Sequence, residues 1–295
     1  MDLKRLKIFC EVYRQRGFSP AARRLKLTQS AVSQQVRALE KELGVALFDP
    51  VARQHPTAAG DFLYREGALI LAAADDVQRG IAAAGGVGSG KVKFGMIDTA
   101  AIEIMPRVLS AFKRENPEVE IEAVVKASGE LVDMVAGHEI DFAVAVTNRI
   151  PEGLVASTVY RDSMVAVVPQ GSEFVGRSIS LRELRGKPLI LYPLSSHSRM
   201  LIEDVFREHG IAPAVSMEMH YPEAICSLVQ QGMGVGLISE LSAREQRLRG
   251  QAIVRVKELR GLREIGIVYH RVRRLAPQSK ALMEAIVRTG RRRKL

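Results

Sequence analysis

Five polar side chains can recognise DNA if one helix holds them on a common face. At 100° per residue, the spacing after residue 28 clusters them on one side: Ser30, Ser33, Gln34, Arg37 and Lys41. The face carries hydroxyl, carboxamide and cationic groups and no carboxylate. Such groups pair with base edges and phosphate oxygens in a major groove, which admits one helix. An ordinary solvated helix has the same kind of face, so the neighbouring elements decide between the two interpretations.

A short helix and a tight turn come before the polar helix. Ser19 is the expected N-cap of the short helix and Pro20 its first residue, and residues 26–28 form the turn. Thr28 caps the second helix, and Gly44 ends it. Its apolar residues recur at steps of four, three and four: Val32, Val36, Leu39 and Leu43. Two helices joined by a tight turn favour DNA recognition over a solvated surface.

Two further segments complete this N-terminal region. Residues 2–16 form a supporting helix that Gly17 ends, and its inward stripe contains Leu6, Phe9, Cys10 and Tyr13. Residues 48–60 form a short wing-like loop, because Pro50 and Pro56 exclude a helix there. Arg53 and His55 are the wing residues that can reach the DNA backbone or the minor groove.

Residues 21–48 carry a resemblance to a known family. They read AARRLKLTQSAVSQQVRALEKELGVALF and resemble the N-terminal helix-turn-helix of the LysR-type transcriptional regulators. In that family, the segment matching residues 29–35 opens the recognition helix and contacts the operator. The resemblance implies a winged helix-turn-helix domain over residues 1–58, a homodimer or homotetramer, and contact with RNA polymerase. The implied DNA-binding residues are Thr28, Gln29, Ser30, Ser33, Gln34, Arg37, Lys41 and Arg53.

The charge of the chain agrees with a nucleic-acid partner. The 295 residues carry a formal charge of +10 and a pI of about 9.8. Eleven Lys or Arg stand against five Asp or Glu in residues 1–57, and the C-terminal tail is basic as well. This balance favours double-stranded DNA or another polyanion over an acidic protein partner. The length predicts about two domains with a substantial core.

The cysteine content and the N-terminus indicate a cytoplasmic protein. Cys10 and Cys226 are the only cysteines, and both are expected to be core residues. No closely spaced ligands predict a metal site, and a thiol sensor of the family needs a second cysteine in its effector domain. The N-terminus is too polar for a signal peptide, and no apolar run approaches the roughly 20 residues of a membrane helix. We therefore expect no membrane partner and no cofactor besides a non-covalent small-molecule effector.

Residues 59–84 form an expected linker helix. Three apolar residues recur every seven positions: Leu63, Ile70 and Val77. The family resemblance implies that this stripe pairs two chains in a dimer. Packing against the chain's own next domain is the alternative. Residues 85–90 read GGVGSG and form a hinge, because no strand precedes them as a phosphate-binding loop requires.

Residues 91–295 alternate between apolar strands and helices, which predicts parallel strands in two α/β halves. The expected strands are 92–97, 119–126, 142–146, 155–159, 164–168, 189–191, 215–219, 235–238 and 265–269. EIDFAV, SSHSR and VQQGMGVGLIS resemble the family's effector-binding domain, which implies a periplasmic-binding-protein-like fold with two subdomains. The predicted fold class is thus α/β with an N-terminal all-α winged helix-turn-helix domain.

A ligand site is expected in the cleft between the two halves. Open α/β sheets bind ligands at the carboxyl ends of their strands, and the helix starts there favour a small anion. Ordinary helix capping is the alternative role for the serines at these positions. The family resemblance implies that Thr99, Ser128, Ser196 and Ser198 line this cleft. The other candidates are Ala100, next to Thr99, and three residues at other strand ends that can complete the specificity of the pocket, Thr147, Asn148 and His220.

Taken together, the sequence predicts a sequence-specific transcriptional regulator, an activator or a repressor, controlled by a small anionic metabolite. No catalytic triad or paired carboxylates are indicated, so an enzyme is not expected. Two alternatives are a cytoplasmic two-lobed solute-binding protein and an architectural DNA-binding protein. The basic N-terminal region argues against the first, and the predicted cleft argues against the second.

Overall fold

The structure, a computed structural model, describes residues 2–50, 52, 55–84, 90–245, 248 and 250–292. The chain divides into two units. The first is Met1–Val87 with the short segments Gly137–Glu139 and Arg273–Ala276, and the second is the remainder. The predicted hinge at 85–90 therefore coincides with the main division, although residues 85–89 lie outside the described part of the chain. Two short segments of the predicted C-terminal domain group with the first unit.

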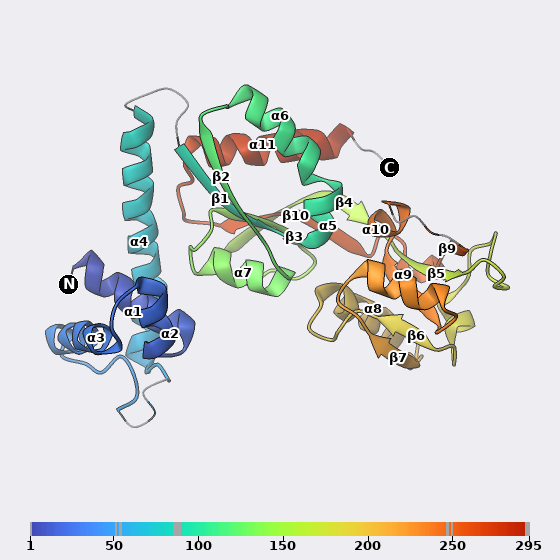
Figure 1. The fold of residues 1–295 in the computed structure, drawn as a ribbon, viewed down its shortest axis with the longest axis horizontal. Coiled ribbons are helices and arrows are strands. Elements are labelled where there is room, and N and C mark those ends of the chain that lie inside the picture. The colour runs from blue at the N-terminus through green and yellow to red at the C-terminus, as the bar shows by residue number, and fades with distance from the viewer. Residues whose placement is uncertain are drawn as a thin grey trace. The chain divides into compact units, whose positions relative to one another are not determined.

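Helices build the first unit (Figure 1). They are α1 (Leu3–Gln15), α2 (Phe18–Leu25), α3 (Gln29–Leu43) and α4 (Ala58–Ala84). Leu6 and Phe9 of α1 form one core with Val32, Val36 and Leu39 of α3. The predicted apolar stripe of α3 is thus confirmed for three of its four members. Leu43, at the last residue of α3, is exposed.

The helix ends follow side-chain and backbone chemistry. The Thr28 hydroxyl accepts a hydrogen bond from the Ala31 amide at 3.2 Å, and Gly44 has a φ of 70°, as a helix-ending glycine requires. The predicted N-cap Ser19 is wrong, because α2 begins at Phe18 and Gly17 takes the cap position. Ser19 and Pro20 lie inside the first turn, where proline's missing N–H has no intrahelical partner to lose.

The loop after α3 closes with a minimal antiparallel pairing. Phe48 and Pro56 form an isolated bridge, and the Asp49 amide donates to the His55 carbonyl at 2.9 Å. The described residues from 48 to 57 are thus not helical, whereas α4 begins at Ala58, inside the segment 48–60 that the sequence predicts as a loop. The predicted DNA contact Arg53 lies outside the described residues.

The long helix α4 is partly packed and partly open. Thr57 caps it by accepting from the Gly60 amide at 3.1 Å. Leu63 packs against the core of the first unit, whereas Ile70 and Val77 are 43% and 61% exposed. The seven-residue stripe therefore has two environments. Its N-terminal member packs within the chain, and the next two present apolar surface to solvent.

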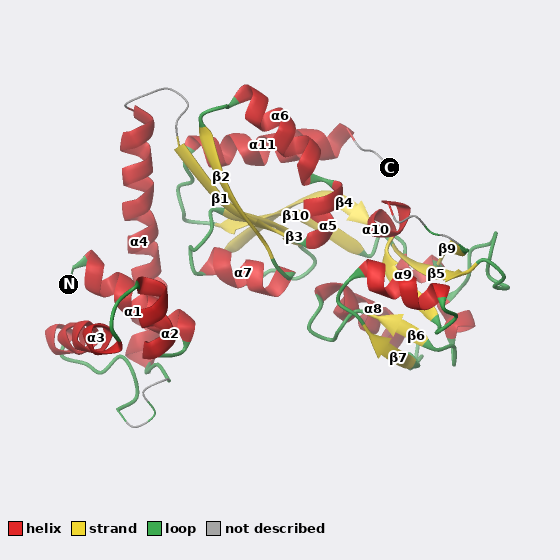
Figure 2. Cartoon of the chain, in the orientation of Figure 1, coloured by secondary structure: helices red, strands yellow, loops and turns green. Residues whose placement is uncertain are grey.

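The second unit contains two mixed sheets, which Figure 2 shows as separate groups of strands. The first sheet has the spatial order β2 (Val119–Val125), β1 (Gly90–Met96), β3 (Phe142–Val146), β10 (Arg263–His270) and β4 (Leu154–Asp162). The second has the order β7 (Val215–Glu218), β6 (Leu189–Leu191), β8 (Val235–Ser239), β5 (Met164–Pro169) and β9 (Gln251–Arg255).

Within each sheet the predicted parallel strands are confirmed, and antiparallel strands are added. β1 pairs in parallel with β2 and β3, and β6 does so with β7 and β8. β10 runs antiparallel to β3 and β4, and β5 runs antiparallel to β8 and β9. The sequence reading missed β9, because its polar ends interrupt the apolar pattern.

Helices cover the sheets of the second unit. In the first lobe they are α5 (Asp98–Glu103), α6 (Met105–Glu115), α7 (Ser128–Ala136) and α11 (Pro277–Arg292). Figure 1 shows α6 and α11 along one face of the first sheet and α7 along the other. The second lobe carries η1 (Leu181–Leu184), α8 (His197–Glu208), α9 (Pro222–Gln230), α10 (Glu240–Glu245) and η2 (Lys257–Leu259). Cover on both faces explains why every residue of β3 is buried.

The chain passes from one lobe to the other by two crossover segments, residues 162–164 between β4 and β5 and residues 256–262 between β9 and β10. The two segments are joined by a hydrogen bond, because the Gly261 amide donates to the Ser163 hydroxyl at 3.1 Å. The predicted organisation into two α/β halves joined by crossing segments is thus observed.

We expect Ile70→Glu to destroy self-association before it unfolds the second unit. A charge on the exposed apolar stripe opposes its burial against a second copy of α4, while Ile70 contributes nothing to the second unit's core. Analytical ultracentrifugation measures the assembly. Arg65→Glu is the control, an exposed site about 140° around α4 from Ile70. An Ile70→Glu protein that sediments like the wild type would contradict the interface.

Candidate functional site

The polar face predicted for α3 is exposed in the structure, except at Ser33. Thr28, at the N-cap, and five residues of the helix are exposed: Gln29, Ser30, Gln34, Arg37 and Lys41. Ser33 is only 8% exposed, so its contact with DNA stays a prediction. At 100° per residue it lies about 40° from Arg37 and about 60° from the buried Val36, which puts it at the edge of the polar face.

Two long side chains on the exposed face of α3 are not taken up by other groups of the described chain. The Thr28 and Ser30 hydroxyls hydrogen-bond to each other at 3.1 Å, whereas Arg37 has no ion-pair partner among the described residues. The long side chains of Gln34 and Arg37 are therefore available to an external partner. A helix that packs on one side and presents such groups on the other can enter a DNA major groove.

The second unit holds a cavity of about 480 Å³ where its two lobes face each other. Residues from both lobes line it, among them Asp98, Thr99, Ser128, Tyr192, Ser196, His197, Ser198, His220, Tyr221 and Arg263. Its volume is that of a site for a small metabolite. The cavity brings together five of the eight predicted effector residues, namely Thr99, Ser128, Ser196, Ser198 and His220.

Four helices begin at this cavity. α5 starts at Asp98, α7 at Ser128, α8 at His197 and α9 at Pro222, each beside a residue of the cavity wall. A helix start carries unpaired amide groups and a partial positive charge. Such starts, meeting from both lobes, form a surface that favours negative charge on a ligand.

Ordinary helix capping does not account for the serines of the cavity. Ser196 occupies the N-cap of α8, but no side-chain cap bond forms there, and Tyr221 at the N-cap of α9 makes none either. Ser128 uses its hydroxyl to accept from the Val146 amide at 3.2 Å, which ties α7 to the end of β3. The amide groups at these starts thus keep unused donor capacity.

Three predicted effector residues lie away from the cavity. Ala100 is buried in the core of the first lobe. Thr147 and Asn148 bond to the start of β10 instead: the Asn148 carboxamide donates to the Leu262 carbonyl at 3.0 Å and accepts from the Glu264 amide at 2.9 Å. Their side chains thus bond to the chain around the start of β10, which pairs antiparallel with β3, and their contact with an effector stays a prediction.

Arg263 is the cavity residue that the sequence reading missed. Its side chain is 4% exposed, and it donates at 3.2 Å both to the Thr99 hydroxyl and to the Asp162 carboxylate. Its Nε atom is buried and finds no hydrogen-bond partner in the described chain. The sequence around Arg263 does not distinguish it from other arginines that precede an apolar strand. Its place in the cavity wall becomes visible only in the folded chain.

Burial sets the ionisation of two other cavity residues. It lowers the pKa of His197, an effect that nearby Arg149 reinforces, so the imidazole is neutral at pH 7. Burial also raises the pKa of Tyr192, which keeps the phenol protonated. Nδ1 of His197 is buried without a partner among the described residues. Both rings therefore offer neutral hydrogen-bonding groups to a ligand.

The cysteines are buried and unreactive in character. Burial raises the pKa of Cys10 to about 12 and that of Cys226 to about 11, so both thiols are protonated at neutral pH.

Within the described residues, no three His, Cys, Asp or Glu side chains are grouped to hold a metal ion. A search of the same residues finds no helix of the length and hydropathy that a membrane span needs.

A helix-turn-helix with a free polar face, followed by a two-lobed domain with a ligand cavity, defines a class: ligand-responsive DNA-binding regulators. Two family models match the chain. Residues 3–61 match the bacterial regulatory helix-turn-helix protein of the lysR family, and residues 85–291 match the LysR substrate binding domain. The chain belongs to the LysR family, whose members regulate transcription by binding DNA.

Named relatives agree with this assignment. The HTH-type transcriptional regulator CbbR of Xanthobacter flavus is 32% identical over 298 residues, which cover 98% of this chain and 88% of that protein. The RuBisCO operon transcriptional regulator of Acidithiobacillus ferrooxidans is 31% identical, over 96% of this chain and 92% of that protein. Both are named as regulators.

A solved structure shares the fold. The crystal structure of full-length CbnR in complex with its target DNA matches with a TM-score of 0.63 at 22% identity, over 98% of this chain and all of that one. The order of a helix-turn-helix domain and a two-subdomain effector domain is thus the same in both proteins.

We expect Arg37→Ala to weaken binding to all duplexes about equally and to lower the salt slope of binding by about one, because its position along α3 brings it to the phosphates rather than the bases. Gln34→Ala is the matched comparison, and it should relax the choice of sequence at an unchanged salt slope. Fluorescence anisotropy over a series of salt concentrations measures both. An unchanged slope for Arg37→Ala removes the phosphate contact.

Proposed function

We propose that this regulator responds to a small metabolite that carries an acidic group and binds in the cavity between its lobes. The observation that carries the proposal is the meeting of four helix starts and the buried Arg263 at one cavity. These groups are donors and positive dipole ends. An acidic group placed among them gains hydrogen bonds that the ligand-free protein leaves unmade.

A carboxylate in the cavity wall also constrains which other groups the ligand can carry. Asp98 lines the wall, and its carboxylate accepts from the amide and the hydroxyl of Thr99 at 2.7 and 3.4 Å. A carboxylate attracts a donor and repels a second anion. We infer that the metabolite combines its acidic group with a hydroxyl or ammonium group directed at Asp98. Hydroxy acids and amino acids have this combination.

Ligand binding is proposed to change how paired chains act on DNA. A ligand shifts such an equilibrium only by its differential affinity for two arrangements, and a tenfold change in DNA affinity corresponds to about 1.4 kcal/mol. Hydrogen bonds to a charged group contribute about 1.5–3 kcal/mol each, so two of them suffice. Assembly of at least two chains through α4, and contact with RNA polymerase, belong to the same proposal.

A thermal-shift panel tests the ligand class. Hydroxy acids and amino acids should raise the Tm of the full chain more than carboxylic acids of the same skeleton without the hydroxyl or ammonium group. Both sets of compounds should raise the Tm through their acidic group. The additional rise with hydroxy acids and amino acids should come from the hydrogen bond to Asp98. Equal shifts for both sets would contradict the role of Asp98.

We expect Thr99→Val and Ser128→Ala each to abolish the effect of the metabolite on DNA affinity while leaving ligand-free DNA binding intact. Each change removes a hydroxyl of the cavity wall, and neither residue belongs to the first unit. Operator titrations with and without the compound found in the panel measure the effect. Thr289→Val, a hydroxyl deletion on α11 outside the cavity, is the control. A normal response in both cavity variants would place the sensor elsewhere.

A further inference from the structure

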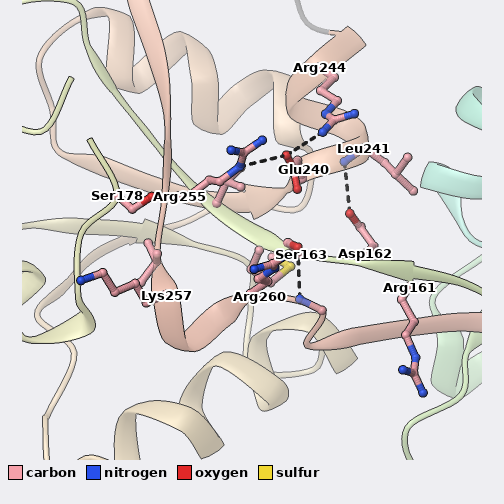
Figure 3. Close-up of a pocket in the computed structure, with 14 residues that line it drawn as sticks. Arg161, Asp162, Ser163, Ser178, Glu240, Leu241, Arg244, Arg255, Lys257 and Arg260 are labelled. Atoms are coloured by element: carbon pink, nitrogen blue, oxygen red, sulfur yellow. Dashed lines mark hydrogen bonds and ion pairs between the residues drawn. The ribbon is translucent and has the colours of Figure 1, made fainter. Parts of the chain in front are cut away.

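A second cavity of about 580 Å³ lies in the second unit beside the crossover segments (Figure 3). Five cationic side chains line it, against two carboxylates. The cations are Arg161, Arg244, Arg255, Lys257 and Arg260. They come from β4, α10, β9 and the crossover after β9, so the fold gathers them from separate parts of the sequence.

The two carboxylates are already engaged. Glu240 serves two cations, Arg244 at 2.9 Å and Arg255 at 3.8 Å, and Figure 3 shows its carboxylate between their guanidinium groups. Asp162 is buried and accepts from Arg263 at 3.2 Å, from the Ser239 hydroxyl at 2.6 Å and from the Leu241 amide at 3.2 Å. Neither has capacity to neutralise the remaining cations of the cavity.

Positive charge is therefore in excess there. Arg161 pairs with Glu264 at 3.1 Å, outside the cavity wall. Arg260 has no ion-pair partner among the described residues, and Lys257 attracts Glu183 only beyond ion-pair distance. Like charges that converge on one concave surface repel one another unless a counterion joins them.

We propose that this second cavity binds a small polyanion, a compact molecule with two or more negatively charged oxygen groups such as a phosphate ester or a polycarboxylate. One guanidinium group can donate two parallel hydrogen bonds to a phosphate or a carboxylate. In this cavity, more than one cationic side chain can contact the same ligand. The concave shape and the volume suit a small molecule better than an extended macromolecule, which flat basic surfaces accommodate.

The position of the cavity makes such a ligand a modulator of the first site, an inference that rests on the proposed function. Asp162 and Ser163 line the second cavity. Asp162 pairs with Arg263, the first residue of β10, and Ser163 accepts from the amide of Gly261 in the other crossover segment. Arg263 in turn lines the first cavity and donates to Thr99. The buried Arg263 and Asp162 pair thus lies between the two cavities, and a polyanion on one side changes the crossover that supports the other.

The direct test is calorimetric titration of the full chain with pyrophosphate, acetate and tricarballylate, a tricarboxylate without the hydroxyl group that the first cavity selects. Pyrophosphate or tricarballylate should bind at least about tenfold more tightly than acetate, because several cations act on one ion. If only one of the two polyanions binds, its chemistry defines the source of the ligand. Equal binding of all three anions, or no binding of either polyanion, overturns the proposal.

Two variants locate the binding. The double change Lys257→Gln with Arg260→Gln should weaken polyanion binding about tenfold or more, whereas the charge-preserving pair Lys257→Arg with Arg260→Lys should retain it. Arg182→Gln with Arg185→Gln, exposed arginines of the same lobe outside the cavity, is the matched control. Wild-type affinity in the charge-removing variant, or equal losses in the control, places the anion elsewhere and overturns the site.

The failure of this site is distinguishable from a failure of the first one. The variant Lys257→Gln with Arg260→Gln should keep the thermal shift that hydroxy acids or amino acids produce at the first site, and loss of that shift together with pyrophosphate binding would assign the anion to the first cavity and overturn the second. Operator titration without any added anion excludes a DNA surface. Weaker DNA binding and a lower salt slope in the charge-removing variant would identify the cations as phosphate contacts and also overturn the proposal.

Discussion

A buried ion pair between Arg263 and Asp162 is the constraint on which the second unit depends. Both side chains are less than one-twentieth exposed, and such charges persist inside a protein only when they are paired and hydrogen-bonded. Burial raises the pKa of Asp162, and Arg263 together with the Ser239 hydroxyl opposes that rise. Removing one partner of a buried pair costs about 3–5 kcal/mol. The pair therefore fixes the end of β4 to the start of β10, where the chain crosses between the lobes, and it places Asp162 in the wall of the second cavity and Arg263 in the wall of the first.

The first cavity follows from the way parallel strands and helices alternate. Each parallel strand must be followed by a crossover, so the helix starts gather at the carboxyl ends of the strands. Two lobes that face each other across crossover segments bring two such edges together. Two carboxylates line the resulting surface. Glu130 is paired with Lys126, and Asp98 is the one on which the proposed selectivity depends.

In the first unit, the packing of helices decides which side chains are exposed. Its helices bury one apolar stripe each in a shared core, so the polar groups of α3 are left on the outside at a defined spacing. The N-terminal turns of the long helix α4 pack against this core, whereas Ile70 and Val77 remain exposed. The polar face of α3 and the proposed ligand cavity thus lie in separate units, so the proposed coupling between DNA binding and ligand binding must act through the arrangement of the whole chain.

Local patterns in the sequence were sufficient for the helix-turn-helix, the linker helix and most strands. Thr28, Gly44 and the stripe from Val32 to Leu39 act within one or two turns, so their consequences can be read without a fold. The same reasoning placed Ser128 and Ser196 at helix starts, because strand and helix periods are local as well. It put the N-cap of α2 at Ser19 instead of Gly17, because one or two residues decide where a helix begins, and it did not anticipate the burial of Ser33 at the edge of the polar face.

Only the tertiary structure decided which distant residues meet. Arg263 and Thr99 are 164 positions apart, and Asn148 bonds to β10 rather than to a ligand because an antiparallel strand returns beside β3. The cations of the second cavity come from four separate elements, none of which has an unusual composition of its own. Strand order and crossover geometry are long-range properties, and sequence periodicity carries no information about them.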